Sequence, residues 1–181
     1  MRVCQSAVFG LVAFTLAVLP VWAQDAKSVG QGAQAVEVTP YVALFGSSGA
    51  SPIGAAVTFP ITSTLSVETD VAYRRAEGRI HALSANTSLL WFLPRVGRST
   101  PYVATGVGLS QYGAPLFSLD GPPIATQSRV AMTVNAGGGL KMPVNENLGL
   151  RTDVRWFKSF GRQGSEQFRV SHGISFSTRK P

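Results

Sequence analysis

The two histidines of the sequence, His81 and His172, are the first residues to test for catalysis. A hydrolytic site that uses histidine as its base needs a nucleophilic serine beside that histidine and an acid that orients it. The same-face neighbours of His172 in an extended strand are Val170 and Ile174, so no serine lies two positions away. Ser84 lies three positions after His81 and therefore on the opposite face of a strand. A serine from a neighbouring strand stays an open alternative, but we expect no catalytic residues.

Metal and cofactor binding have no better support. Two distant histidines and a single cysteine, Cys4, give no ligand spacing. Glu68 and Asp153 could bind a cation, but Arg151 and Arg155 lie two positions on either side of Asp153 and favour ion pairs. The glycine-rich stretch GVGLSQYG is not followed by a helix, as a phosphate-binding loop would require. We therefore expect no metal site and no cofactor.

The charged residues of LGLRTDVRW, at positions 148–156, indicate what kind of element carries them. Bulky apolar residues occupy every second position, and Gly149, Arg151, Asp153 and Arg155 lie between them. Side chains alternate between the two faces of a strand, so this pattern predicts a strand with one apolar and one charged face. Which face is the inside is the question that decides the class of protein.

The N-terminus has the pattern of a secretory signal peptide. Arg2 precedes the apolar run AVFGLVAFTLAVLP, and Val-Trp-Ala ends at Ala23 as a cleavage site requires. An uncleaved membrane anchor is the alternative, but the run is shorter than the about 20 residues that a spanning helix needs. We predict a signal peptide at 1–23, a flexible periplasmic leader at 24–35 and one folded domain at 36–178.

The charge balance of the exported chain is basic but does not indicate nucleic acid. Removal of Arg2 lowers the net charge from +7 to +6. An exported chain rarely meets nucleic acid, and no basic cluster is interleaved with stacking aromatic residues. Anionic lipid headgroups are the better match. With Cys4 removed, the mature chain also has no cysteine for a disulfide.

The folded domain shows period-two alternation and no convincing helical spacing, which predicts an all-β fold. Short turns, around Pro60 to Thr64 and Pro143 to Asn147, alternate with larger loops, of which 113–128 is the longest. Eight strands are expected, at residues 36–46, 53–61, 65–75, 80–93, 101–113, 128–142, 147–160 and 166–177.

Two closed folds fit eight such strands. In a soluble barrel the apolar face points inward, and in a transmembrane barrel it points to lipid. The polar face here is rich in Gly, Ala, Ser, Thr and Asn rather than in Lys and Glu, which suits a narrow interior. Charges can lie there only if they are paired. The polar face carries four acids and four bases: Glu37, Glu68, Asp70, Asp153, Lys141, Arg151, Arg155 and Arg169.

Aromatic residues give a further argument for the membrane. They gather near strand ends, where the rings of Tyr and Trp favour the headgroup level. We predict one aromatic girdle at the end with the larger loops, made of Phe45, Tyr73, Tyr112, Trp156 and Phe168. We predict a second girdle at the end with the tight turns, made of Phe59, Trp91, Tyr102 and Phe176. The sequence therefore predicts an eight-stranded antiparallel up-and-down transmembrane β-barrel.

Two segments, PYVATGVGLS at 101–110 and NAGGGLKMPVNENLGLRTDVRWF at 135–157, resemble the outer-membrane protein β-barrel domain family. These are the small eight-stranded barrels related to OmpA and OmpX. The resemblance covers residues 36–178 and implies a barrel in a Gram-negative outer membrane, inserted by the outer-membrane assembly machinery. Such barrels commonly end on an aromatic residue, whereas Phe176 is followed here by Ser-Thr-Arg-Lys-Pro.

The expected function is a non-enzymatic structural or surface-interaction role with a lumen closed by pairs such as Glu68 with Arg151 and Glu37 with Lys141. A narrow pore for small solutes, a lipid A-modifying enzyme and a soluble periplasmic ligand-binding barrel are the alternatives. We expect a monomer in contact with outer-membrane lipid. Basic residues at the larger-loop end could bind lipopolysaccharide phosphates: Arg74, Arg75, Arg79, Arg129, Lys158 and Arg162.

Overall fold

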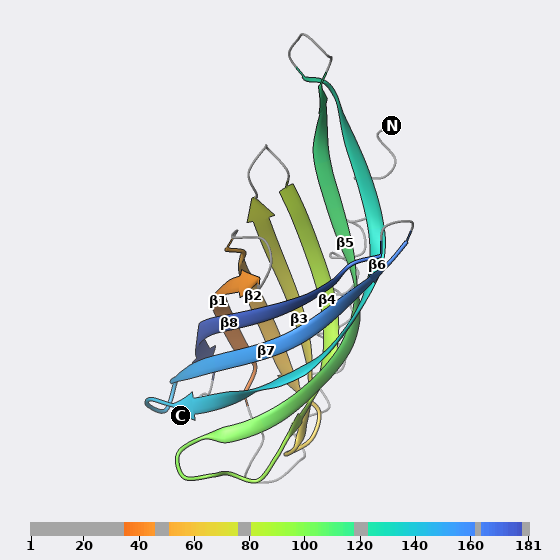
Figure 1. Cartoon of the computed structure of the whole chain (residues 1–181). Helices are drawn as coiled ribbons and strands as arrows, with labels where there is room; N and C mark the ends of the chain where they lie inside the picture. The colour runs from red at the N-terminus through yellow and green to blue at the C-terminus, as the bar shows by residue number, and fades with distance from the viewer. Residues whose placement is uncertain (1–34, 46–50, 76–80, 118–122, 162–163, 179–181) are drawn as a thin grey trace.

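The computed structural model describes residues 35–45, 51–75, 81–117, 123–161 and 164–178 (Figure 1). The predicted signal peptide, 1–23, and the predicted leader up to residue 34 lie outside the described residues. Within the described part of the chain, no helix is long and apolar enough to cross a membrane.

Eight strands form one closed barrel in which each strand pairs with its neighbours in chain order. All neighbouring strands are antiparallel, and β1 pairs with β8 to close the barrel. The strands are β1 (Glu37–Phe45), β2 (Ile53–Pro60), β3 (Leu65–Arg75), β4 (His81–Phe92), β5 (Thr100–Phe117), β6 (Pro123–Pro143), β7 (Leu148–Phe160) and β8 (Glu166–Ser177). The predicted eight-stranded up-and-down barrel is confirmed.

The two faces of each strand differ as the sequence alternation predicts. On β7, Arg151, Asp153 and Arg155 are buried, while Leu150 and Val154 are about half exposed, at 50% and 46%. The other strands repeat the pattern, with apolar side chains outward and mostly small, polar or charged ones inward, together with a few large buried side chains such as Leu90, Phe92 and Tyr102. A protein that turns its large apolar side chains outward needs an apolar solvent, so this is the arrangement of a transmembrane barrel.

Side-chain hydrogen bonds close two of the tight turns. In the turn between β2 and β3, Thr62 Oγ1 accepts hydrogen bonds from the backbone N–H groups of Thr64 and Leu65, at 3.2 and 3.0 Å. In the turn between β6 and β7, Asn145 Oδ1 accepts them from Asn147 and Leu148, at 2.9 and 2.8 Å. Both are local turns that Thr and Asn favour because their side chains replace a missing backbone acceptor.

The hairpin of β5 and β6 differs from the sequence prediction. We expected a long loop at 113–128, but the two strands continue to pair through that segment, from Gly113 with Ser128 to Phe117 with Pro123. In Figure 1 this hairpin rises well beyond the other strands. Proline lacks a backbone N–H group but can lie at a strand edge where no partner needs it, so Pro115 and Pro123 do not end the pairing. Among the described residues, the pairing of β5 with β4 ends at Gly113 with His81.

Candidate functional site: the barrel lumen

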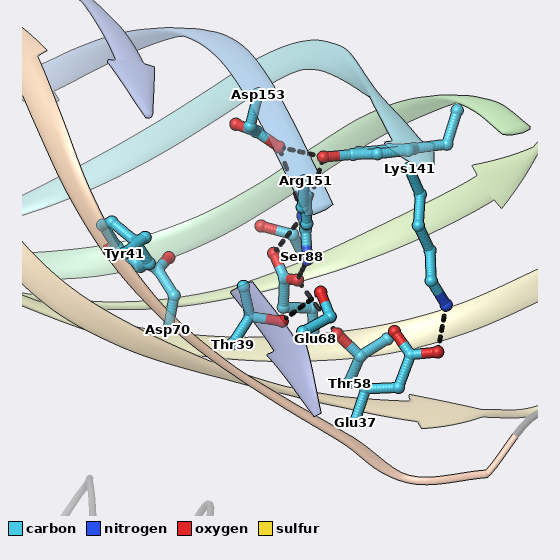
Figure 2. A network of polar contacts seen from close by, with 12 residues as sticks. Glu37, Thr39, Tyr41, Thr58, Glu68, Asp70, Ser88, Lys141, Arg151 and Asp153 are labelled. Atoms are coloured by element: carbon cyan, nitrogen blue, oxygen red, sulfur yellow. Dashed lines mark hydrogen bonds and ion pairs between the residues drawn. The ribbon is translucent and has the colours of Figure 1, made fainter. Parts of the chain in front are cut away.

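A buried glutamate, Glu68 of β3, lies inside the lumen and binds two arginines of β7, of which Figure 2 labels Arg151. Arg151 donates to both of its carboxylate oxygens, and Arg155 Nη2 donates to Oε1 at 2.6 Å. Thr58 of β2 adds a hydroxyl donor at 3.0 Å. The side chain of Glu68 is only 2% exposed. Its charge is therefore compensated by protein groups, as burial requires.

Asp153 ties the same two arginines together from their own strand. It lies between Arg151 and Arg155 in sequence, and period-two alternation places all three side chains on the lumen face. Asp153 Oδ2 is 3.2 Å from Arg151 Nη2 and 3.0 Å from Arg155 Nη2, and Oδ1 is 2.8 Å from Arg155 Nε. The hydroxyl of Tyr102 on β5 donates to Asp153 at 2.5 Å and accepts from Arg151 Nε at 2.7 Å. The network therefore joins β3, β5 and β7 across the barrel.

A second buried pair, Asp70 of β3 with Arg169 of β8, lies beside the first network. Arg169 Nη1 is 3.0 Å from Asp70 Oδ2, and the hydroxyl of Tyr41 donates to the same oxygen at 2.6 Å. The guanidinium group also lies over the rings of Phe157, at 4.6 Å, and Tyr41, at 5.1 Å. Such stacking suits a planar cation that is removed from water.

A third pair, Lys141 of β6 with Glu37 of β1, lies nearer the tight-turn end of the lumen. It borders an open vestibule of about 620 Å³, which Phe92, Asn147 and Ser175 also line. The side chain of Lys141 is 21% exposed and that of Glu37 is 10% exposed. This pair is therefore less completely removed from water than the two central ones.

The centre of the lumen is filled. The void among Glu68, Asp70, Arg151, Arg155 and Arg169 measures only about 10 Å³. That volume holds about one water molecule at most, since a site for one needs roughly 10–15 Å³. Three acids and three bases surround the void, because Asp153 also lines it, so their formal charges cancel. The charged groups around the void are therefore balanced, three against three.

Two glycines make room for the lumen tyrosines. Tyr41 pairs in register with Gly54, and Tyr102 pairs with Gly139. A methyl group at Gly54 would lie 2.6 Å from Cζ and from the hydroxyl oxygen of Tyr41, and one at Gly139 would lie 2.7 Å from Cζ of Tyr102. We predicted that the glycines at 137–139 provide space for long side chains. Gly139 has this geometry, although its neighbour is a tyrosine rather than an arginine.

The structure brings the eight predicted lumen charges onto one interior surface. Seven of them are buried, and Lys141 is intermediate. Glu68 lies against Arg151, and Glu37 lies against Lys141, as the two suggested pairs require. The sequence suggested no partner for Asp70, which the structure places against Arg169.

The predicted aromatic girdles are wrong at two positions, Tyr102 and Tyr112. Tyr102 is wrongly placed there, because it is 3% exposed and bonded to Asp153 inside the lumen. Tyr112 also points inward, with its hydroxyl 3.3 Å from the buried Ser159. Position near a strand end misled the prediction, because alternation sets the face. The outward members are Tyr73, Trp91, Phe168 and Phe176, which are exposed, and Phe59 and Trp156, which are partly covered. The side chain of Phe45 lies outside the described set.

The predicted lipopolysaccharide contacts lie on both faces of the barrel wall. Arg75 and Arg129 are exposed, Arg74 is partly covered, and Lys158 forms an exposed ion pair with Glu166 at 3.0 Å. The strand register places Arg74 and Arg129 in one row with the inward-pointing Tyr112, across β3 to β6, whereas Arg75 lies on the outward face. Arg79 and Arg162 lie outside the described residues.

Sequence reasoning missed several lumen residues that are not charged. Tyr41, Thr58, Ser88 and Phe157 all contact a lumen charge. Each lies on the inward face by the same alternation that located the charges. Applied to every strand, the alternation alone would have found them.

The two histidines lie outside the lumen network. His172 is exposed on the outward face of β8, and its Nδ1 lies 3.1 Å from Thr152 Oγ1 on β7. His81 is exposed at the start of β4. Over the described ranges, no three His, Cys, Asp or Glu side chains gather as a metal site would require.

No known family profile matches the sequence, and no curated protein matches it. Solved structures do match. Over 81% of this chain and 98% of the other, it is similar to the N-terminal β-barrel domain of Pseudomonas aeruginosa OprF, with 18% identity and a TM-score of 0.57. Over 78% of this chain and 95% of the other, it is similar to Neisserial surface protein A (NspA), with 13% identity and a TM-score of 0.63.

The chain is also similar to the outer membrane enzyme PagL, with 20% identity and a TM-score of 0.50 over 78% of this chain and 99% of that one. The chain therefore has the fold of the small eight-stranded outer-membrane barrels. That fold is shared by an enzyme, so it does not by itself assign an activity.

Proposed function

We propose that this chain is a non-enzymatic outer-membrane barrel with a structural or surface-interaction role and a lumen that does not conduct. The observation that carries the proposal is the filled centre, where Glu68, Asp153 and two arginines surround a void of about 10 Å³. A solute path would need these ion pairs to separate inside the barrel. Separation would leave buried charges uncompensated, which costs several kcal/mol.

The outward apolar surface supports a membrane location over a soluble ligand carrier. Val42, Leu44, Trp91 and Phe168 are each exposed by 57% or more. In a soluble barrel the apolar face lines the cavity, whereas here the cavity is lined by charges. The matching structures, which are outer-membrane barrels, support the same location.

The depth of His172 argues against a lipid-modifying enzyme. His172 and Thr152 are hydrogen bonded and so resemble a base beside a nucleophile. On β8, His172 lies four residues from each of the outward rings of Phe168 and Phe176. With a rise of about 3.3 Å per residue and a strand tilt of about 40°, that places it roughly 10 Å from either girdle. The ester and phosphate groups of a lipid lie at the headgroup level, out of its reach.

Planar-bilayer conductance tests the closed lumen directly. Purified wild-type protein is expected to show no steady channels across a bilayer. The matched variants are Glu68→Ala, in the central network, and Glu146→Ala, at an exposed turn carboxylate. Steady channels in the wild type would contradict a closed lumen. If Glu68→Ala left those channels unchanged, the central ion pairs would not lie on the conducting path.

Fractionation tests the location. We expect the mature chain in the outer-membrane fraction, with a shift in gel mobility on boiling that reports an unfolding barrel. Recovery from the soluble periplasm, without such a shift, would contradict the membrane assignment.

We further propose that the larger-loop end contacts the phosphates of lipopolysaccharide. Arg75 and Arg129 are exposed there, and Arg74 lies in the same row as Arg129 across β3 to β6. Arginine binds phosphate groups with paired N–H donors. The test is the amount of lipopolysaccharide that remains with the purified protein. Arg75→Ser with Arg129→Ser should lower it, whereas Arg95→Ser, at the tight-turn end, should not. Equal losses in both would contradict the proposal.

A further inference from the structure

His172 is a polar side chain on the lipid-facing surface at the middle of the membrane. It is exposed on β8, between the apolar side chains of Val170 and Ile174 on the same face. Its register neighbours are Val42 on β1 and Thr152 on β7. The two outward phenylalanines of β8 lie four residues above and below it. The imidazole ring therefore lies in the part of the bilayer that offers only acyl chains.

The imidazole is only partly satisfied there. Thr152 Oγ1 is 3.1 Å from Nδ1, and among the described residues no partner is found for Nε2. Lipid chains have no donor or acceptor, and a polar group without a partner in hydrocarbon costs several kcal/mol. Ionisable residues in membrane segments are rare for this reason and usually meet a polar partner. The open nitrogen therefore indicates that another protein surface covers this point.

We propose that the His172–Thr152 pair is the polar centre of an interface between two copies of this chain in the membrane. Two copies that share one membrane are related by an axis along its normal, so identical residues meet at equal depth. His172 of one copy therefore finds the matching imidazole of the other without a shift in height.

The chemistry of the pair allows this meeting. A neutral imidazole has one donor nitrogen and one acceptor nitrogen, and a hydroxyl group can donate or accept. Thr152 therefore supports either tautomer of His172. One copy can donate from its Nε2–H, and the other can accept at its Nε2. Two identical chains can therefore pair here when they hold opposite tautomers, and the two-fold relation then applies to the heavy atoms and not to the protons.

The surface around His172 suits a close contact between barrels. Apolar side chains on the three strands β1, β8 and β7 surround it, and Val42, Leu150, Val154 and Ile174 are each between 46% and 57% exposed. No outward charge on these strands lies between the levels of Phe168 and Phe176. Association in lipid depends on packing and on buried hydrogen bonds rather than on the hydrophobic effect. The apolar rim supplies the packing, and His172 supplies the hydrogen bond. This interface would replace the monomer expected from the sequence.

Site-directed crosslinking in membranes tests the proposal. The full chain carries Cys4→Ser and one introduced cysteine, either Ile174→Cys beside the pair or Val107→Cys on the opposite wall at β5. A short bis-maleimide should join two copies through position 174 and not through position 107. A mobility shift on boiling verifies that each variant folds.

His172→Leu then isolates the polar contact, because leucine keeps an apolar surface and suits lipid. In the Ile174→Cys background it should lower the crosslinked dimer roughly threefold or more, as the loss of one hydrogen bond in a membrane predicts. Thr105→Val, a hydroxyl loss on the opposite wall, should leave the dimer unchanged. Equal crosslinking at positions 174 and 107, no dimer at either, an unchanged dimer in His172→Leu, or a crosslink only to a different protein would each overturn the proposal.

Discussion

The middle of the lumen and its tight-turn end use the same chemistry with different degrees of burial. In the middle, Glu68 and Asp153 share two arginines around a void of about 10 Å³. At the tight-turn end, Glu37 and Lys141 form a single pair beside a vestibule of about 620 Å³. A buried charge depends wholly on its partners, whereas a hydrated one can exchange them for water. An acid–base pair can therefore be essential for stability where it is fully buried and replaceable where water reaches it.

Loss of the central carboxylate should have the largest effect. Glu68→Ala leaves Arg151 and Arg155 without their shared acceptor, so we expect the free energy of unfolding to fall by about 3–5 kcal/mol. Urea unfolding in detergent micelles, followed by tryptophan fluorescence, measures this. Glu146→Ala, at an exposed turn, is the matched control and should change stability by less than about 0.5 kcal/mol. Equal stability of both variants would remove the distinction between the two regions.

Loss of the Tyr41 hydroxyl group, which lies between Asp70 and Arg169, should have the second largest effect on stability. In Tyr41→Phe the ring stays, but Asp70 loses a donor at 2.6 Å and Arg169 loses an acceptor at 3.1 Å. A hydrogen bond to a charged group contributes about 1.5–3 kcal/mol. The same unfolding experiment should show a loss in that range. Tyr73→Phe, on the outward surface, should show almost none, and a similar loss there would contradict the assignment.

An added methyl group opposite Tyr41 should destabilise by crowding. Gly54→Ala would push into the ring of Tyr41, and overpacking of this kind costs about 1–3 kcal/mol. The cost should shrink when Tyr41 is replaced by Leu, because the ring contact is then removed and only the contact with the backbone oxygen of Val71, also at 2.6 Å, remains. A double-mutant cycle of unfolding free energies measures the coupling. Strictly additive effects would mean that the ring is not what Gly54 accommodates.

Loss of the pair at the tight-turn end should have the smallest effect. Lys141→Ala is expected to lower the free energy of unfolding by about 0–1 kcal/mol, because Glu37 can be hydrated from the vestibule. That small effect should fade as salt is raised, whereas the effect of Glu68→Ala should persist. Unfolding at low and high sodium chloride concentration distinguishes the two. A large, salt-independent loss in Lys141→Ala would place this pair in the same class as the central one.

The lumen charges show how much of the site can be predicted from the sequence. Period-two alternation assigned Arg151, Asp153 and Arg155 to one face, and the composition of that face predicted that it lies inside. Tyr102 shows the limit of a weaker signal, since nearness to a strand end suggested a membrane girdle, while its alternation with Ala104 placed it in the lumen. The extended β5–β6 hairpin was missed because proline is compatible with both a loop and an outer strand edge.

The sequence by itself determined the number of strands, their approximate bounds and which side chains face inward, because each depends only on neighbours in the chain. The tertiary structure decided which acid meets which base. Asp70 and Arg169 are 99 positions apart and become partners through the register of closed, tilted strands. It also decided that the centre is filled while the tight-turn end stays open, since the size of a void depends on how side chains from opposite walls meet.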